Sequence, residues 1–478
     1  MSFTSRWRDV YLAAGARAIS TCGDFLAATA LTLALQQAGA SGTTISALML
    51  AATVPLVVLA PVTGRIADRV DSRIILMATG SVQAMICAAL AFAGSPALII
   101  ALVGALACGL AVTQPTLAAL LPAMVRREDL GKAGGVNQTA GTLGMLVAPA
   151  LAGVLVGQFG TRVPLLLDAA TYLALVVAGF LLRTRRGPAA DTSGPAADTS
   201  GPAADTSGPA AVGSGPAADT SWAADHPGPV AWRMRGDRLL TVMVAAVAAV
   251  VGGVGAINVV EVFFVRETLG ASATMYGLVT GAWTAGCLVG SVLFGRLGRG
   301  LTEPARLVRG LLVQLAACCG AVLVAASVRS AAPLIGLWLI GGAFNGALNV
   351  STTVVIALRV PERARGRAFA VFGSAVQGAG MAGLLLGGVL LDRFDPRLLI
   401  AGAGVAGLVA VAACVPSVRA AVRRERLAEE SPTRPAAGSP TPLSRSDLES
   451  PGVGDERGDS GPSAAGGMRM RLRDSVGS

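Results

Sequence analysis

The chain has 478 residues, of which 53% are hydrophobic and only 14% are charged. Soluble domains carry about a quarter charged residues, so this composition argues against an ordinary soluble domain. The net charge of +10 does not indicate nucleic-acid binding, because the arginines lie at the ends of apolar blocks and in the C-terminal tail, without interleaved aromatics.

The apolar residues form twelve blocks, each long enough to cross a hydrocarbon layer of about 30 Å as a helix rising ~1.5 Å per residue. We therefore expect an all-α membrane protein with twelve transmembrane helices. The predicted spans are 11–36, 43–64, 74–94, 97–121, 134–157, 163–182, 239–265, 274–295, 307–328, 331–358, 368–391 and 398–416.

Positive charges set the expected orientation. If the N-terminus is cytoplasmic, the inner short loops hold 14 positive residues: Arg65, Arg69, Arg73, Arg126, Arg127, Lys132, Arg296, Arg299, Arg306, Arg309, Arg359, Arg363, Arg365 and Arg367. The outer loops hold 5: Arg162, Arg266, Arg329, Arg393 and Arg397. The positive-inside rule then predicts a multi-pass protein of the cell membrane with both termini in the cytoplasm.

We expect no cleavable signal peptide, because the first apolar block is too long for a signal core and contains Arg17 and Asp24. All seven cysteines fall within predicted spans, where a small buried hydrophobe is the expected role. The single histidine, His226, lies outside the spans, and no metal-ligand spacing is present. We expect neither a metal nor a cofactor.

Residues 187–221 repeat the motif GPAADTS, in which each Gly-Pro prevents a helix or strand from propagating. This predicts a disordered cytoplasmic linker at 187–237, between six-helix bundles at 1–186 and 238–417. The polar tail at 418–478 is also expected to be disordered.

The two bundles resemble each other in sequence. Three segments recur in the second half after 231 to 235 residues: 64–69 in 295–300, 131–133 in 366–368, and 153–162 in 388–397. Six spans per half gives both halves the same orientation. The sequence therefore predicts two pseudo-symmetric bundles related by a parallel duplication, with a substrate site between them near mid-membrane.

The segment after the second span reads GRIADRVDSR, from Gly64 to Arg73. It resembles the loop signature of the major facilitator superfamily, in which a glycine is followed by Asp-Arg and a further arginine, here Asp68 and Arg69. The resemblance implies the major facilitator fold and a gating loop. In the family, the equivalent acid pairs with the start of the eleventh helix, near Gly366 here, where a helix N-terminus favours an anion. The alternative interpretation is that the arginines of this segment only set the membrane topology, but that does not account for Asp68.

The fifth span resembles the antiporter motif of drug exporters, at Gly141, Gly144, Pro149 and Gly153, with alanine at two positions where glycine is usual. Its small face would allow tight crossing with a helix of the other half. Ordinary small-residue packing is the alternative interpretation.

Two longer stretches suggest a subfamily. RAISTCGDFLAATALTLAL in span one and GTRVPLLLDAATYLALVVAGF in span six are similar to the drug:proton antiporter group that contains macrolide-efflux and enterobactin-exporter proteins.

Apart from Arg309 at the inner edge of its span, four ionisable residues lie within the spans: Arg17, Asp24, Asp168 and Glu261. Each would cost at least ~2.5 kcal/mol if it faced lipid, so each is expected to face a cavity or a partner. Asp24 lies ~20 Å along span one and is the first choice for proton coupling, with Glu261 second. Arg17 shares a helix face with Asp24, and a purely structural pair is the competing interpretation. Asp168 is expected to have a structural role.

Further polar residues within the spans are candidates for lining a cavity, although interhelical hydrogen bonding would explain each of them equally well. They are Gln114, Asn137, Gln138, Asn258, Asn345, Asn349 and Gln377.

Together these features predict a secondary transporter that exports a drug-like or amphipathic small molecule by alternating access, driven by protons. The expected partners are that small molecule, protons and the lipid bilayer, with no nucleic acid, and we expect a monomer. An importer or uniporter of the same fold, and a non-transporting sensor or scaffold, remain alternatives. A membrane enzyme lacks support, since the spans contain no paired Asp-rich motif, no His/Glu metal cluster and no nucleophile signature. The sequence also contains no ATP-binding P-loop, so the energy must come from a gradient or from the substrate itself.

Overall fold

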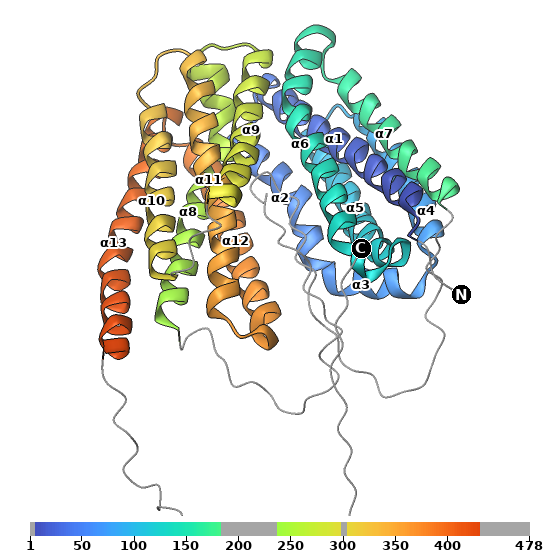
Figure 1. Ribbon diagram of the computed structural model, residues 1–478. Helices are drawn as coiled ribbons and strands as arrows, with labels where there is room; N and C mark the ends of the chain where they lie inside the picture. Colours follow the sequence, from blue (N-terminus) through green and yellow to red (C-terminus); the bar gives the residue numbers. More distant parts are fainter. Residues whose placement is uncertain (1–4, 183–236, 298–303, 431–478) are drawn as a thin grey trace, which may run out of the picture. The chain divides into compact units, whose positions relative to one another are not determined.

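A computed structural model of the chain describes residues 5–182, 237–297 and 304–430 (Figure 1). These residues form helices, with no strand among them. The first half contains α1 (Trp7–Gln37), α2 (Gly42–Val58), α3 (Ala60–Arg69), α4 (Ser72–Leu90), α5 (Pro96–Met124), η1 (Arg127–Asp129), α6 (Leu130–Phe159) and α7 (Arg162–Leu181). The second contains α8 (Arg238–Phe263), η3 (Phe264–Thr268), α9 (Ala273–Leu297), α10 (Pro304–Ala325), α11 (Ala332–Arg359), α12 (Glu362–Leu391) and α13 (Pro396–Glu430).

Within the described residues, eleven helices are long and apolar enough to cross a membrane, and the shorter apolar helix α2 has 17 residues. Each falls on one of the twelve predicted spans, so the all-α, twelve-helix fold is confirmed. The second predicted span is broken at Leu59, which separates α2 from α3. Pro61 explains the break, because it has no N–H to donate to the preceding turn.

The sequence predicts disorder in two polar segments, the linker and the C-terminal tail, and the structure describes only the start of the tail. The sequence predicts disorder in the tail from residue 418, but α13 continues to Glu430. The segment RAAVRRERLAEE explains this difference, because alanine, arginine, leucine and glutamate are all strong helix formers. The repeat-containing linker and residues 431–478 lie outside the described residues.

The two ends of the bundle are named here after the first and last residues of α1, Trp7 and Gln37. At the Trp7 end, the backbone N–H of Arg6 donates to the Met124 carbonyl at 2.8 Å. At the Gln37 end, the Gln36 amide donates to the Glu267 carboxylate at 3.0 Å. The first contact lies within the first half, whereas the second joins the two halves.

The buried apolar side chains follow the same division. At the Gln37 end, one core includes both halves, with Leu33 of α1 and Val260 of α8 among its members. Toward the Trp7 end, the described residues form separate cores, one around Val10 in the first half and one around Leu240 in the second. The halves are therefore packed together at the Gln37 end.

Glycines allow the helices of the two halves to approach each other closely. A Cβ on Gly153 of α6 would lie 2.6 Å from the Ala273 carbonyl oxygen of α9 and 3.0 Å from the Cα of Gly277. A Cβ on Gly42 of α2 would lie 2.8 Å from the Gly388 carbonyl oxygen of α12. Gly388 follows Gly153 by 235 residues, and Gly277 follows Gly42 by the same number. The internal repeat thus produces two equivalent crossings, α6 on α9 and α2 on α12.

Candidate functional site

Asp24 lies in the middle of α1 and is half-buried. Its Oδ1 accepts a hydrogen bond of 2.5 Å from the Tyr172 hydroxyl of α7. Tyr172 itself is 0% exposed, so it carries its polar group into the packed interior of the first half. The predicted carboxylate therefore has a neutral donor on a neighbouring helix as its partner.

Asp168 stands one turn before Tyr172 on α7 and is 0% exposed. Its carboxylate accepts hydrogen bonds from the Cys87 thiol of α4 at 3.0 Å and from the Thr171 hydroxyl at 3.1 Å. Asp168 and Asp24 interact electrostatically. Two carboxyl groups thus belong to one polar cluster, held by three hydrogen-bond donors that carry no charge.

Gly23 is what allows α1 to approach this cluster. A Cβ at that position would overlap the Asp168 carboxylate and the Thr171 hydroxyl. The sequence signal Gly23-Asp24 therefore has two functions, because the glycine admits one carboxyl from α7 while the aspartate supplies the second.

Arg17, predicted to share a face with Asp24, lies against α6. Its Nε would be 3.3 Å from a Cβ on Gly141. The glycine gives this long side chain room between α1 and α6. Asp24 accepts a hydrogen bond from Tyr172, and its pairing with Arg17 stays a prediction.

Glu261, the second candidate for proton coupling, is buried near the Gln37 end of α8 and is 6% exposed. The Thr280 hydroxyl of α9 donates to its Oε1 at 3.2 Å, and the Trp338 side chain of α11 interacts with this carboxyl. Both of these partners belong to the second half, so Glu261 is buried within that half.

The motif on α6 contacts helices of both halves. Gly144 packs against the Ala18 carbonyl of α1, in the same half. Gly153 packs against α9, and the Pro149 carbonyl lies against Gly277 of the same helix. The tight crossing predicted between α6 and the other half is therefore present in the structure.

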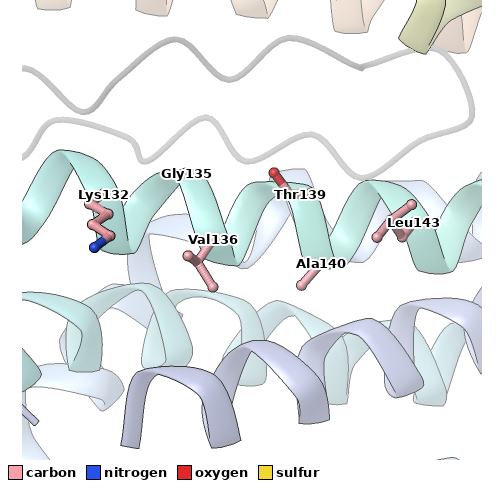
Figure 2. Close-up of a pocket in the computed structure, with 6 residues that line it drawn as sticks. All are labelled: Lys132, Gly135, Val136, Thr139, Ala140 and Leu143. Atoms are coloured by element: carbon pink, nitrogen blue, oxygen red, sulfur yellow. The ribbon is translucent and has the colours of Figure 1, made fainter. Parts of the chain in front are cut away.

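A shallow pocket lies on α6 toward the Trp7 end, and Figure 2 shows its six lining residues along one stretch of the helix: Lys132, Gly135, Val136, Thr139, Ala140 and Leu143. The ammonium of Lys132 lies 4.8 Å from the centroid of the Trp7 ring, a cation–π contact. None of the seven predicted cavity residues lines this pocket.

Those polar residues occupy different positions. Asn345 of α11 is buried, and its Oδ1 accepts from the Asn349 amide at 3.3 Å and from the Cys287 thiol at 3.6 Å. It therefore joins α9 to α11, which favours interhelical hydrogen bonding for this residue. The remaining six are half-buried: Gln114, Asn137, Gln138, Asn258, Asn349 and Gln377.

The segment predicted to be a gating loop is helical up to Arg69, where α3 ends. The side chains of Asp68 and Arg69 lie outside the described residues, as do the surroundings of Gly64. Arg73 donates to the Phe180 carbonyl of α7 at 3.2 Å, so this arginine joins two helix ends of the first half.

The contacts between α2 and α12 are not among the predicted features. The Gly42 N–H donates to Oδ1 of Asp392 at 2.7 Å, and the Ser46 hydroxyl donates to the Leu384 carbonyl at 2.6 Å. The available sequence signal is the repeat itself, because Gly388 and Asp392 lie in the segment that duplicates 153–162.

The protein-family model described as Major Facilitator Superfamily matches residues 13–259 and 242–453. No curated protein matches the sequence. Among solved structures, a bacterial homolog of the human lysosomal transporter Spinster, in an inward-facing and unoccupied conformation, aligns with a TM-score of 0.59 and 15% identity over 90% of this chain and 98% of that chain. A point mutant of the nucleoside transporter NupG aligns with a TM-score of 0.62 and 14% identity over 85% of this chain and 99% of that chain.

Proposed function

The chain belongs to the major facilitator superfamily, and on that premise we propose that it is a proton-coupled exporter of amphipathic small molecules. In this proposal it works by alternating access in the cell membrane, as a member of the drug:proton antiporter group. The sequence contains no P-loop, and the proposal assigns the driving force to a proton gradient.

The observation that carries the proposal is the setting of Asp24. A coupling carboxylate needs access to a proton and must exchange it without disrupting the fold. Asp24 lies in the middle of α1, and the hydrogen bond that it accepts comes from a neutral tyrosine. Gaining a proton therefore breaks no ion pair with Tyr172, and losing it leaves a charge that the tyrosine hydroxyl still stabilises.

Coupling also requires that protonation differs between the two access states. α1 carries Asp24, and α6 packs on α1 through Gly144 and on the other half through Gly153. A rearrangement of the α6–α9 crossing therefore acts on the helix that bears the carboxylate. This link between proton site and interface supports coupling, and the similarity of α6 to the antiporter motif supports export.

The conformation is compatible with the proposed direction. With both termini in the cytoplasm, the Gln37 end faces outward, and the core shared by both halves lies at that end. Toward the cytoplasmic side, each half has a core of its own. An exporter collects substrate from the cytoplasm in such a conformation and an importer releases it there, so the antiporter-like motif of α6 is what supports export.

The test has two stages. A drug-susceptibility panel that compares a deletion strain with an overexpressing strain identifies a transported compound. The compound with the largest change is then used with purified protein in proteoliposomes, comparing Asp24→Asn with wild type. Asp24→Asn is expected to abolish accumulation driven by a proton gradient while retaining binding and gradient-free exchange of the same compound.

Glu261→Gln is the informative comparison, since it removes the other candidate carboxyl. If Asp24→Asn still concentrates the compound and Glu261→Gln does not, the coupling site lies in the second half. If both variants concentrate it as well as wild type does, proton coupling through either residue is rejected.

A further inference from the structure

The N-terminus of α2 meets the C-terminus of α12 at the Gln37 end, and the two helices belong to different halves. The Gly42 N–H is one of the first four of α2 and therefore has no acceptor within its own helix. Ser41 caps the helix by accepting from the Thr44 N–H at 3.3 Å. The acceptor for Gly42 is the Asp392 carboxylate, at 2.7 Å.

This contact is favourable for two physical reasons. A carboxylate that accepts from a backbone N–H makes a charge-assisted hydrogen bond. It also lies at the positive end of the helix dipole. Both depend on the close crossing, in which Gly42 packs against Gly388 and a Cβ at either glycine would overlap the other helix. Separating the halves at this end must break the Asp392 contact.

The equivalent crossing lacks the acid. Gly157 precedes Asp392 by 235 residues and is its counterpart in the repeat. On α6, a Cβ at Gly157 would lie 3.1 Å from the Thr274 hydroxyl of α9, where Thr274 donates to the Gly153 carbonyl at 3.4 Å. Close packing is therefore common to the two crossings, but a carboxylate at a helix N-terminus is specific to α2 and α12.

We propose that Asp392 is a latch that holds the Gln37 end closed. The contact joins α2 of the first half to α12 of the second half, so it exists only while the two halves are packed together at this end.

The latch biases the conformational equilibrium without requiring any substrate or coupling ion. An acid–helix contact of this kind changes a two-state population by about twofold to fivefold. Closing the Gln37 end engages Asp392, and opening that end breaks the contact. The proposal is therefore independent of proton coupling and of the direction of transport.

The test measures opening at the Gln37 end directly. Spin labels are placed on Gly94→Cys, in the α4–α5 connection, and on Ser330→Cys, in the α10–α11 connection, in a background without native cysteines. Both positions are exposed. Asp392→Asn is expected to raise the population with a long inter-label distance about twofold to fivefold, and Asp392→Glu to restore most of the closed population.

Asp395→Asn is the matched control. This exposed aspartate lies three residues away, and its Oδ1 accepts from the Arg397 N–H at 2.7 Å within its own turn. The Asp395→Asn substitution removes an equal charge but keeps the contact between Asp392 and Gly42 of α2. Equal populations for Asp392→Asn and Asp395→Asn would overturn the latch.

Discussion

At the residue scale, the hydrogen bond between Tyr172 and Asp24 can be measured by a double-mutant cycle. Tyr172→Phe removes the donor and Asp24→Ala removes the acceptor, and a hydrogen bond to a charged group contributes about 1.5–3 kcal/mol. We expect the double variant to be less destabilised than the sum of the single variants by roughly that amount. Unfolding of the purified protein in detergent measures all four members of the cycle. Additivity within about 0.5 kcal/mol would mean that the two side chains are not coupled.

The same residues show what the sequence could reveal about the site. Hydropathy and charge identify Asp24, because a carboxylate in the middle of an apolar span is visible from one segment alone. For Asp168, the place near a span end predicts only a structural role. Its burial comes from Cys87 on α4 and Gly23 on α1, neither of which is close to it in sequence. Partners contributed by other helices cannot be inferred from the spacing within one helix.

At the element scale, the second half contains a very close helix pair, α9 with α11, and glycines account for it. A Cβ on Gly290 would overlap the Ala343 backbone, and one on Gly346 would overlap the Cys287 backbone. Gly290→Ala is therefore expected to lower stability by about 1–3 kcal/mol through overpacking.

The control for that prediction is Gly320→Ala on α10, where no atom lies within 4 Å of the added Cβ. Since alanine is the better helix former by about 1 kcal/mol, this variant should match or exceed the wild type in stability. Thermal unfolding monitored by size-exclusion of the residual folded protein compares the two. Equal losses for both variants would show that the α9–α11 crossing does not depend on the missing side chain.

Helix lengths are largely predictable because the bilayer sets the number of apolar residues per span. The departures arise where another effect overrides hydropathy. Pro61 ends α2 within an apolar segment, and the helix-forming sequence after residue 417 extends α13 beyond the last apolar residues. In both places local backbone preferences, rather than hydrophobicity, decide where a helix begins or ends.

At the scale of the whole molecule, the repeat predicts two equivalent crossings but not which end of the bundle is closed. One sequence must support at least two conformations of similar free energy, so neither state is visible in its pattern. The shared core at the Gln37 end and the Asp392 contact identify the closed end here. Whether that closed end faces the outside depends on orientation, which rests on the arginine distribution.

Orientation can be tested by cysteine accessibility in intact cells. A membrane-impermeant maleimide is expected to label Ser330→Cys, at the Gln37 end, and not Ser200→Cys, within the repeat linker. Permeabilised cells should show labelling at both positions, which controls for reactivity. The reason is the excess of arginine on the linker side, which favours retention of those loops in the cytoplasm. Labelling of the linker in intact cells would invert the topology. The closed Gln37 end would then face the cytoplasm, and the conformation described here would be open to the outside instead.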